Sequence, residues 1–248
     1  MDAVIPESTV YVLSGSALGA LALLFAVWTA RLPSAVRRYG LAVVVGTASM
    51  AVAYFLMSAG VLTVQTTGRE QSAARFLGYT GTWTAFAYLL AAVAGAGRRT
   101  AAILLAAILW VQWATLVSWV VGGTAELLVS VSMLAALALV VYLLFVPFTR
   151  RAGETTGERF LLFSKLKYLT VLGWAGLVTV AIVSEQNLAL VDMFVGQVAA
   201  TYIDVVLLAG LGGIVLRHVG ALEATAAGTD APRDVSSGDL DHDANPAD

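Results

Sequence analysis

The feature that most constrains the fold of this chain is a series of seven apolar blocks, each about 20–28 residues long. At ~1.5 Å of rise per residue, one such block crosses the ~30 Å hydrocarbon core of a bilayer as a single α-helix. The alternating ~10-residue segments of a membrane β-barrel are not visible. The blocks run roughly over 9–31, 38–63, 72–96, 100–122, 125–148, 160–184 and 189–217. We therefore predict an all-α membrane protein, a multi-pass bundle of seven transmembrane helices in the cell membrane.

Composition supports a membrane domain followed by a different kind of segment. The chain is 59% hydrophobic and 12% charged, about half the charged fraction of a typical soluble domain. The last residues are acidic and rich in Pro, Gly and Ser, with almost no apolar side chains. Such a composition buries too little apolar surface to order a chain. We predict a seven-helix transmembrane domain over residues 1–222 and a disordered, acidic cytoplasmic tail over 223–248.

The basic residues predict the orientation of the bundle. One set of alternate connections carries Arg31, Arg37, Arg38, Arg98, Arg99, Arg150, Arg151, Arg159, Lys165, Lys167 and Arg217. The opposite side carries Arg69 and Arg75. Because basic connections stay on the cytoplasmic side, the N-terminus is predicted outside and the C-terminus in the cytoplasm. The twelve arginines, two lysines and acidic tail favour a halophilic, archaeal source.

Several classes of function lack a sequence signal. The chain has no cysteines and two histidines, which argues against disulfides and a zinc site. No Ser–His–acid set or phosphate-binding loop is present, and the basic pairs are explained by topology. We predict a protein that is not an enzyme, holds no metal and binds no nucleic acid.

One acid, Asp204, falls deep inside the last apolar block. An ionised carboxylate at mid-membrane costs about 2.5–3.5 kcal/mol on insertion scales. Such an acid persists when it is neutral, paired or hydrated, so Asp204 marks a candidate buried polar site.

The segment around this acid, YIDVVLLAGLGGIVLR (202–217), resembles the retinal-binding helix of bacteriorhodopsin-like microbial rhodopsins. In that family an aspartate is followed four residues later by the lysine that bonds retinal. Asp204 matches the aspartate, but Leu208 stands at the lysine position. The chain's two lysines, Lys165 and Lys167, are expected at the cytoplasmic mouth of the sixth block. The resemblance implies a rhodopsin-like fold with no covalently bound retinal.

The third block extends the comparison through ARFLGYTGTW (74–83). Arg75 matches the family's arginine, whereas Gly78 stands at the counterion acid and Tyr79 at a tryptophan. In the same register, Leu89 replaces the proton-donor acid of the pumps. A second register pairs Trp83 with the tryptophan and puts Thr82 at the counterion. Neither register supplies an acid, so we expect no light-driven pumping.

The resemblance also proposes neighbours for Asp204 and a remnant of the chromophore pocket. Tyr54 and Arg75 match residues beside this aspartate, so an arginine–carboxylate pair with a tyrosine hydrogen bond is expected. Trp174 matches a ring-contacting tryptophan of the retinal pocket. Three neighbouring aromatic or proline positions are replaced in this chain, by Leu177, Val178 and Ala181.

The remaining candidates lie near the ends of the blocks. Glu185 and Asp192 fall in the region where pumps release protons, although solvated loop acids explain them as well. Three tryptophans of the fourth block are predicted to face lipid or a neighbouring subunit; they are Trp110, Trp113 and Trp119.

Three functions stay open on this basis. The first is an opsin-related protein without covalent retinal, with a regulatory or interaction role toward a membrane-protein partner or a second copy of itself. The second is a photoreceptor that binds retinal or a carotenoid noncovalently. The third is a passive ion channel or transporter that uses the vacated pocket.

Overall fold

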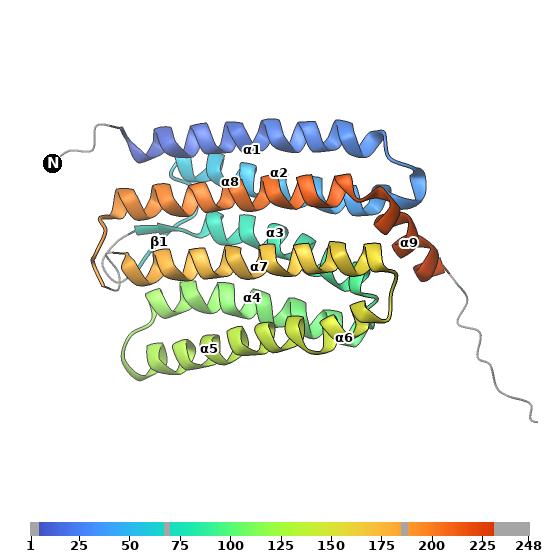
Figure 1. The fold of residues 1–248 in the computed structure, drawn as a ribbon. Helices are drawn as coiled ribbons and strands as arrows, with labels where there is room; N and C mark the ends of the chain where they lie inside the picture. The colour runs from blue at the N-terminus through green and yellow to red at the C-terminus, as the bar shows by residue number, and fades with distance from the viewer. Residues whose placement is uncertain (1–4, 67–69, 185–187, 231–248) are drawn as a thin grey trace, which may run out of the picture.

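The computed structural model describes residues 5–66, 70–184 and 188–230. Within these residues, seven helices are long and apolar enough to cross a membrane. They are α1 (Glu7–Ala30), α2 (Arg37–Ser58), α3 (Ala73–Ala94), α4 (Arg98–Val120), α5 (Gly123–Phe145), α7 (Gly157–Val183) and α8 (Met193–Arg217). They lie side by side in alternating directions as one bundle (Figure 1). The prediction of seven spanning helices is confirmed.

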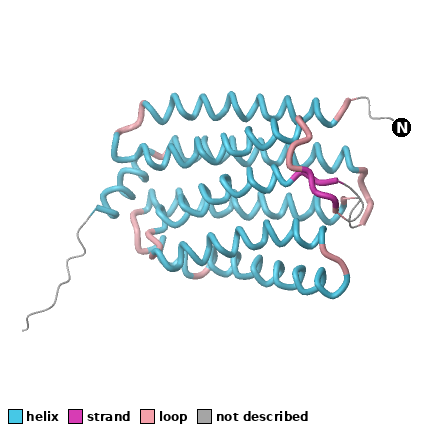
Figure 2. Tube along the Cα trace, turned by 180° about the vertical axis from the view of Figure 1, so that it is seen from behind, coloured by secondary structure: helices cyan, strands magenta, loops and turns pink. Residues whose placement is uncertain are grey.

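A small hairpin marks one end of the bundle, the end at which α1 begins (Figure 2). It pairs β1 (Thr63–Gln65) with β2 (Glu70–Ser72) in antiparallel register, Thr63 opposite Ser72. We call this the hairpin end of the bundle, and the opposite end the arginine-rich end. The apolar blocks did not predict these strands, because three residues are too few to show an alternating pattern.

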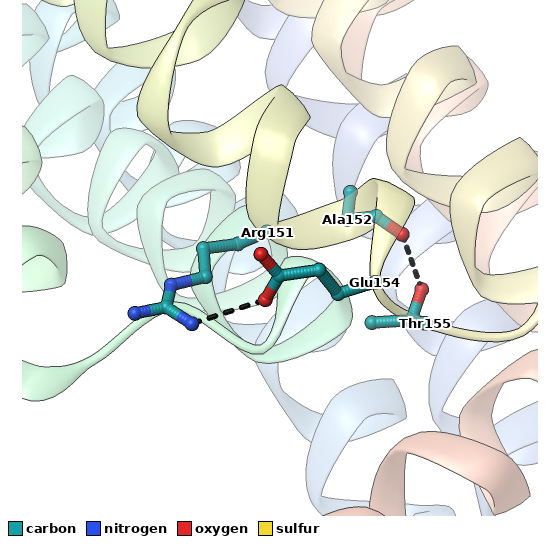
Figure 3. Close-up of polar contacts among 4 residues, drawn as sticks. All are labelled: Arg151, Ala152, Glu154 and Thr155. Carbon is teal, nitrogen blue, oxygen red and sulfur yellow. Dashed lines mark hydrogen bonds and ion pairs between the residues drawn. The ribbon is translucent and has the colours of Figure 1, made fainter.

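The arginine-rich end carries three short helical segments: η1 (Ser34–Val36), α6 (Pro147–Gly153) and α9 (Val219–Asp230). α5 ends at Phe145, two residues before Pro147, which has no backbone N–H to continue the helical hydrogen bonds; Val146 between them has φ −110° and ψ −79°. At the end of α6, Arg151 Nη1 pairs with Glu154 Oε2 at 3.0 Å, and Thr155 Oγ1 donates to the Ala152 carbonyl at 2.6 Å (Figure 3). These contacts organise the turn into α7.

The structure corrects the predicted boundary of the ordered domain. α9 continues to Asp230, past the boundary expected at residue 222; the rest of the predicted tail lies outside the described residues. Ala and Leu favour helix, and a few apolar side chains of α9 suffice to dock it. Ala221, Leu222 and Ala226 are buried where α9 lies across the end of the bundle (Figure 1).

Glycines allow close approach of the N-terminal helices to their neighbours. A Cβ built on Gly212 of α8 would lie 2.0 Å from Cζ of Phe25 in α1. One built on Gly78 of α3 would lie 2.5 Å from the Ala53 Cβ in α2. Small residues let membrane helices pack by backbone contact where lipid supplies no hydrophobic drive.

Candidate functional site in the bundle interior

Asp204 of α8 lies inside the bundle and is 1% exposed. The Tyr54 hydroxyl from α2 donates to its Oδ2 at 2.7 Å. The Tyr79 hydroxyl from α3 lies 3.0 Å from Oδ1 and 3.1 Å from Oδ2. Two hydroxyl donors from two helices thus meet one carboxylate, which offsets the cost of burying it.

The Tyr54 hydroxyl also links this cluster to its surroundings. It lies 3.1 Å from the Thr201 Oγ1 and 3.4 Å from Nη2 of Arg75. Thr201 is three residues before Asp204, so the two side chains share one face of α8. Tyr54 therefore joins α2, α3 and α8 at one point.

Arg75 does not make the direct pair with Asp204 that was expected. Within the described residues, its hydrogen bonds go to the Tyr54 hydroxyl and, from Nη1, to Oε1 of Gln197 at 3.2 Å. Arg75 is one helical turn before Tyr79, nearer the hairpin end, and Gln197 is about two turns before Asp204. The guanidinium therefore bonds at the level of Gln197, and its link to the carboxylate runs through Tyr54.

Leu208, at the position of the family's lysine, is buried in the core at 1% exposure. Both lysines lie in the first half of α7, toward the arginine-rich end. The Lys165 Nζ is 2.9 Å from the His218 Nε2. Lys167 Nζ donates to the Thr149 Oγ1 at 3.0 Å and lies 4.7 Å from the centre of the Phe145 ring.

The two other positions compared with acids also lie in the core. Gly78 packs against α2, where a side chain would meet Ala53 and the Met50 sulfur, at 2.5 and 3.0 Å. Leu89 is fully buried.

Trp174 of α7 stacks on Trp83 of α3, with ring centres 4.8 Å apart and planes 23° apart. Trp83 follows Tyr79 by one helical turn and is 1% exposed. Of the two residues compared with the family's tryptophan, Tyr79 thus bonds Asp204, while Trp83 packs against the remnant aromatic of α7. The Thr82 hydroxyl donates to the Gly46 carbonyl at 2.8 Å.

A cavity of about 180 Å³ lies between α3, α4, α7 and α8. Arg75, Tyr79, Trp83 and Trp174 line it, and so do the three replaced positions of α7, which are Leu177, Val178 and Ala181. The cavity is thus lined in part by the three residues of α7 that stand where the family has aromatic or proline residues.

The peripheral candidates are placed differently. The Asp192 carboxylate caps α8 by accepting from the Val195 N–H at 2.8 Å, a structural role at a helix N-terminus; Glu185 lies outside the described residues. Trp110 is half exposed and lies 3.2 Å from the Ser132 hydroxyl of α5. Trp113 donates to Thr80 of α3 at 3.1 Å, and Trp119 lines the cavity, so these two face the interior instead.

Sequence reasoning missed three polar residues of the interior: Gln112, Gln197 and Thr201, all at most 6% exposed. Gln112 donates to the Phe76 carbonyl. A glutamine inside a membrane span was an available signal, because an uncharged amide in hydrocarbon also needs a partner.

Comparisons with known proteins agree with this architecture. Residues 6–222 match the family described as bacteriorhodopsin-like protein. Sensory rhodopsin-2 of Natronomonas pharaonis is 30% identical over 203 residues, which cover 79% of this chain and 84% of that protein. Among solved structures, the thermophilic rhodopsin of Rubrobacter xylanophilus superposes with a TM-score of 0.81 at 21% identity, covering 89% of this chain and 99% of that one.

A light-driven proton pump from Leptosphaeria maculans superposes similarly, with a TM-score of 0.79 at 16% identity over 90% of this chain and 98% of the pump. At such identity these structures show the fold alone. The family match covers most of the chain, and with it the seven membrane-spanning helices and the buried aspartate of α8. The chain is a multi-pass membrane protein and belongs to the bacteriorhodopsin-like family of microbial rhodopsins.

Proposed function

We propose that this chain is an opsin-related membrane protein that does not attach retinal covalently and does not pump ions in response to light. The observation that carries the proposal is the leucine at position 208. A retinal Schiff base requires a primary amine beside the chromophore pocket; Lys167 is buried at 5% exposure, but it does not line the cavity that contains Trp174. The chain's two lysines bond His218 and Thr149 instead, toward the arginine-rich end.

The interior also supports the absence of pumping. A relay needs a series of groups that exchange protons within hydrogen-bond reach. Gly78 and Leu89 offer no such group at the positions compared with the family's acids. Leu89, Leu207 and Leu208 are at most 2% exposed and belong to the apolar core on the arginine-rich side of Asp204, which also disfavours a passive ion channel.

The test is to add all-trans retinal to the purified protein. We expect no visible absorption band and no retinal adduct after borohydride treatment. A microbial rhodopsin that keeps the lysine, treated in parallel, should form a pigment that borohydride bleaches irreversibly. A band of that kind from this chain would contradict the proposal.

With covalent photochemistry set aside, the function we propose is a regulatory or interaction role in the membrane. The large apolar side chains along α5 support an outward-facing surface: Leu127, Leu128, Val131 and Leu134 are each more than half exposed. Lipid or a membrane-protein partner can cover such a face. Cross-linking in the native membrane should give a complex larger than the single chain, whereas a strictly monomeric product would count against this role.

The size of the cavity makes noncovalent retinal the less favoured alternative. Pockets for drug-sized ligands typically enclose ~300–1,000 Å³, whereas this cavity has about 180 Å³. The stacked Trp83 and Trp174 rings lie beside it. A long polyene would have to separate these rings before it could enter.

A further inference from the structure

We propose that the interior cavity binds a small carboxylate carried on a single ring, with the acid group against Arg75 and Gln197. The inference rests on the proposed function, because a covalently attached retinal would compete for the same space. It goes further by naming the chemical class of the ligand. Three observations identify this class of ligand: buried polar atoms without a hydrogen-bond partner, the positive charge of Arg75 and the volume of the cavity.

Unpaired polar atoms point to a missing partner at this place. Five buried side-chain N or O atoms have no hydrogen-bond partner within the described residues, and four of them belong to residues that line this cavity. Three are donors: Arg75 Nε, Gln197 Nε2 and Trp174 Nε1. The fourth is an acceptor, Gln112 Oε1. Since leaving buried polar groups unmet costs free energy, such a concentration indicates a ligand that accepts hydrogen bonds.

The orientation of each amide is fixed by its other contact. Gln197 Oε1 accepts from Arg75 Nη1 at 3.2 Å, so Nε2 is the atom left over as a donor. Gln112 Nε2 donates to the Phe76 carbonyl, so Oε1 is left over as an acceptor. The unmet donor of Gln197 thus adjoins the guanidinium, and the unmet acceptor suits a hydroxyl on the ring.

The charge of Arg75 favours an anion over a neutral acceptor. Its described hydrogen-bond partners are both neutral, the Tyr54 hydroxyl and the Gln197 carbonyl oxygen. The Asp204 carboxylate is occupied by Tyr54 and Tyr79. A partly buried guanidinium gains most from a carboxylate, which forms short charge-assisted hydrogen bonds with it.

The other walls of the cavity set the size and shape of the ligand. They are mostly apolar and aromatic, with Leu177 and Val178 from α7 and Trp119 from α4, although Thr115 and Ser184 also line the space. The volume is about 180 Å³, and an engineered apolar cavity of ~150 Å³ holds benzene. One ring with a carboxylate therefore fits, whereas a long-chain acid does not.

A second cavity provides the approach. It has a volume of about 240 Å³ at the hairpin end and is lined by polar residues that include Glu7, Glu70 and Ser72. Gln71, Arg75 and Gln197 line both cavities. The hydrogen-bonded Arg75–Gln197 pair therefore stands at the junction, where an acid group that has passed Glu7 and Glu70 meets the guanidinium.

The experiment titrates sodium benzoate into the full chain in detergent, without retinal, and follows tryptophan fluorescence. Trp83, Trp119 and Trp174 line the cavity, so occupancy should change the emission in a saturable way. Benzyl alcohol, which has the same ring without the charge, serves as the matched ligand. We expect it to bind at least about tenfold more weakly than benzoate.

Two variants of the site and one control complete the test. Leu177→Trp fills the cavity and should abolish benzoate binding, while Gln197→Leu removes a donor and should weaken it about tenfold. Leu172→Trp places the same bulk on the outer face of α7, where Leu172 is 69% exposed, and should bind like the unmodified chain. Circular dichroism verifies that each variant keeps its helix content, and Gln197→Leu carries the test if Leu177→Trp does not fold.

Absence of saturable benzoate binding to the folded chain would overturn the inference. So would benzyl alcohol binding as tightly as benzoate, or unchanged binding in folded Leu177→Trp or Gln197→Leu. None of these outcomes bears on the proposed function, which is tested by the borohydride-sensitive retinal band and by cross-linking in the native membrane.

Discussion

At the scale of single residues, the interior is organised around a carboxylate that three helices share. Asp204 lies on α8 and accepts from Tyr54 of α2 and Tyr79 of α3. Each bond crosses between helices far apart in the sequence, so together they fix how α2, α3 and α8 meet. Interhelical hydrogen bonds in membrane proteins contribute about 1–2 kcal/mol in model peptides, and often less in whole proteins.

Replacing Tyr79 with Phe removes one donor from the Asp204 carboxylate and keeps the ring. We expect the free energy of unfolding to fall by about 1–2 kcal/mol, measured by denaturation in mixed micelles. Tyr202→Phe is the matched control, because the Tyr202 side chain is 69% exposed and should tolerate loss of its hydroxyl. Equal effects in the two variants would count against a stabilising role for the Tyr79 bond.

Gly78 permits a second test at this scale. A methyl group there would collide with Ala53 of α2, so Gly78→Ala should destabilise the bundle by about 1–3 kcal/mol through overpacking. A Cβ built on Gly19 of α1 would meet no atom of a neighbouring element within 4 Å, and Gly19→Ala should be neutral or gain up to ~1 kcal/mol from helix propensity. A thermal-unfolding comparison checks both; a stable Gly78→Ala would show that α2 and α3 separate easily.

At the scale of elements, the C-terminus of α3 is held by a side chain from α7. α3 ends at Ala94 and is followed by Gly95, whose φ of 68° lies in the left-handed region. The Arg159 Nη2 donates to the Ala92 and Val93 carbonyls at 3.2 and 3.0 Å, and its Nε donates to Val93 at 3.2 Å. A cation at a helix C-terminus also interacts favourably with the helix dipole.

Arg159→Gln should therefore cost about 1–3 kcal/mol of unfolding free energy, because it removes charged hydrogen bonds to the carbonyls of the last turn of α3. Arg151→Gln is the control from the same end of the bundle. Its ion pair with Glu154 is largely exposed, and such pairs contribute ~0–1 kcal/mol. Chemical denaturation of the two variants should separate them; similar losses would contradict the capping role of Arg159.

The sequence predicted the spanning helices well because each contains an uninterrupted apolar block. It failed at short elements. The β1–β2 hairpin has three residues a strand, and α9 docks through a few apolar side chains, such as Leu222, within a polar-looking segment. Local composition does not reveal tertiary docking of this kind, so the ordered domain was predicted to end at residue 222.

At the scale of the whole molecule, the bundle has one arginine-rich end and one hairpin end. We predict that the arginine-rich end is cytoplasmic. The chain has no cysteine, so a single introduced thiol reports on one place. On intact cells a membrane-impermeant maleimide should label Val61→Cys at the hairpin end, but should label Gly228→Cys in α9 only after permeabilisation. The reverse pattern would contradict the predicted orientation.

The sequence predicted the residues around Asp204, but it did not predict the hydrogen-bond partner of Arg75. The resemblance brought Asp204 and Tyr54 together, and the structure places them 2.7 Å apart. It gave no reason to expect Gln197, whose amide oxygen accepts the Arg75 hydrogen bond that was expected to go to the Asp204 carboxylate. Which of two acceptors a long guanidinium side chain reaches depends on the height of each helix in the bundle, and a sequence pattern fixes that height only to within a turn.

The stacked pair of Trp83 and Trp174 has a consequence for how the bundle can move. The two indoles belong to α3 and α7, so any outward swing of α7 at this level must first pull apart a face-to-face ring contact. The stacked pair therefore holds α3 and α7 together at this level of the bundle. Because indole rings absorb in the near ultraviolet, separation of Trp83 from Trp174 should change the near-ultraviolet spectrum of the protein without an added label.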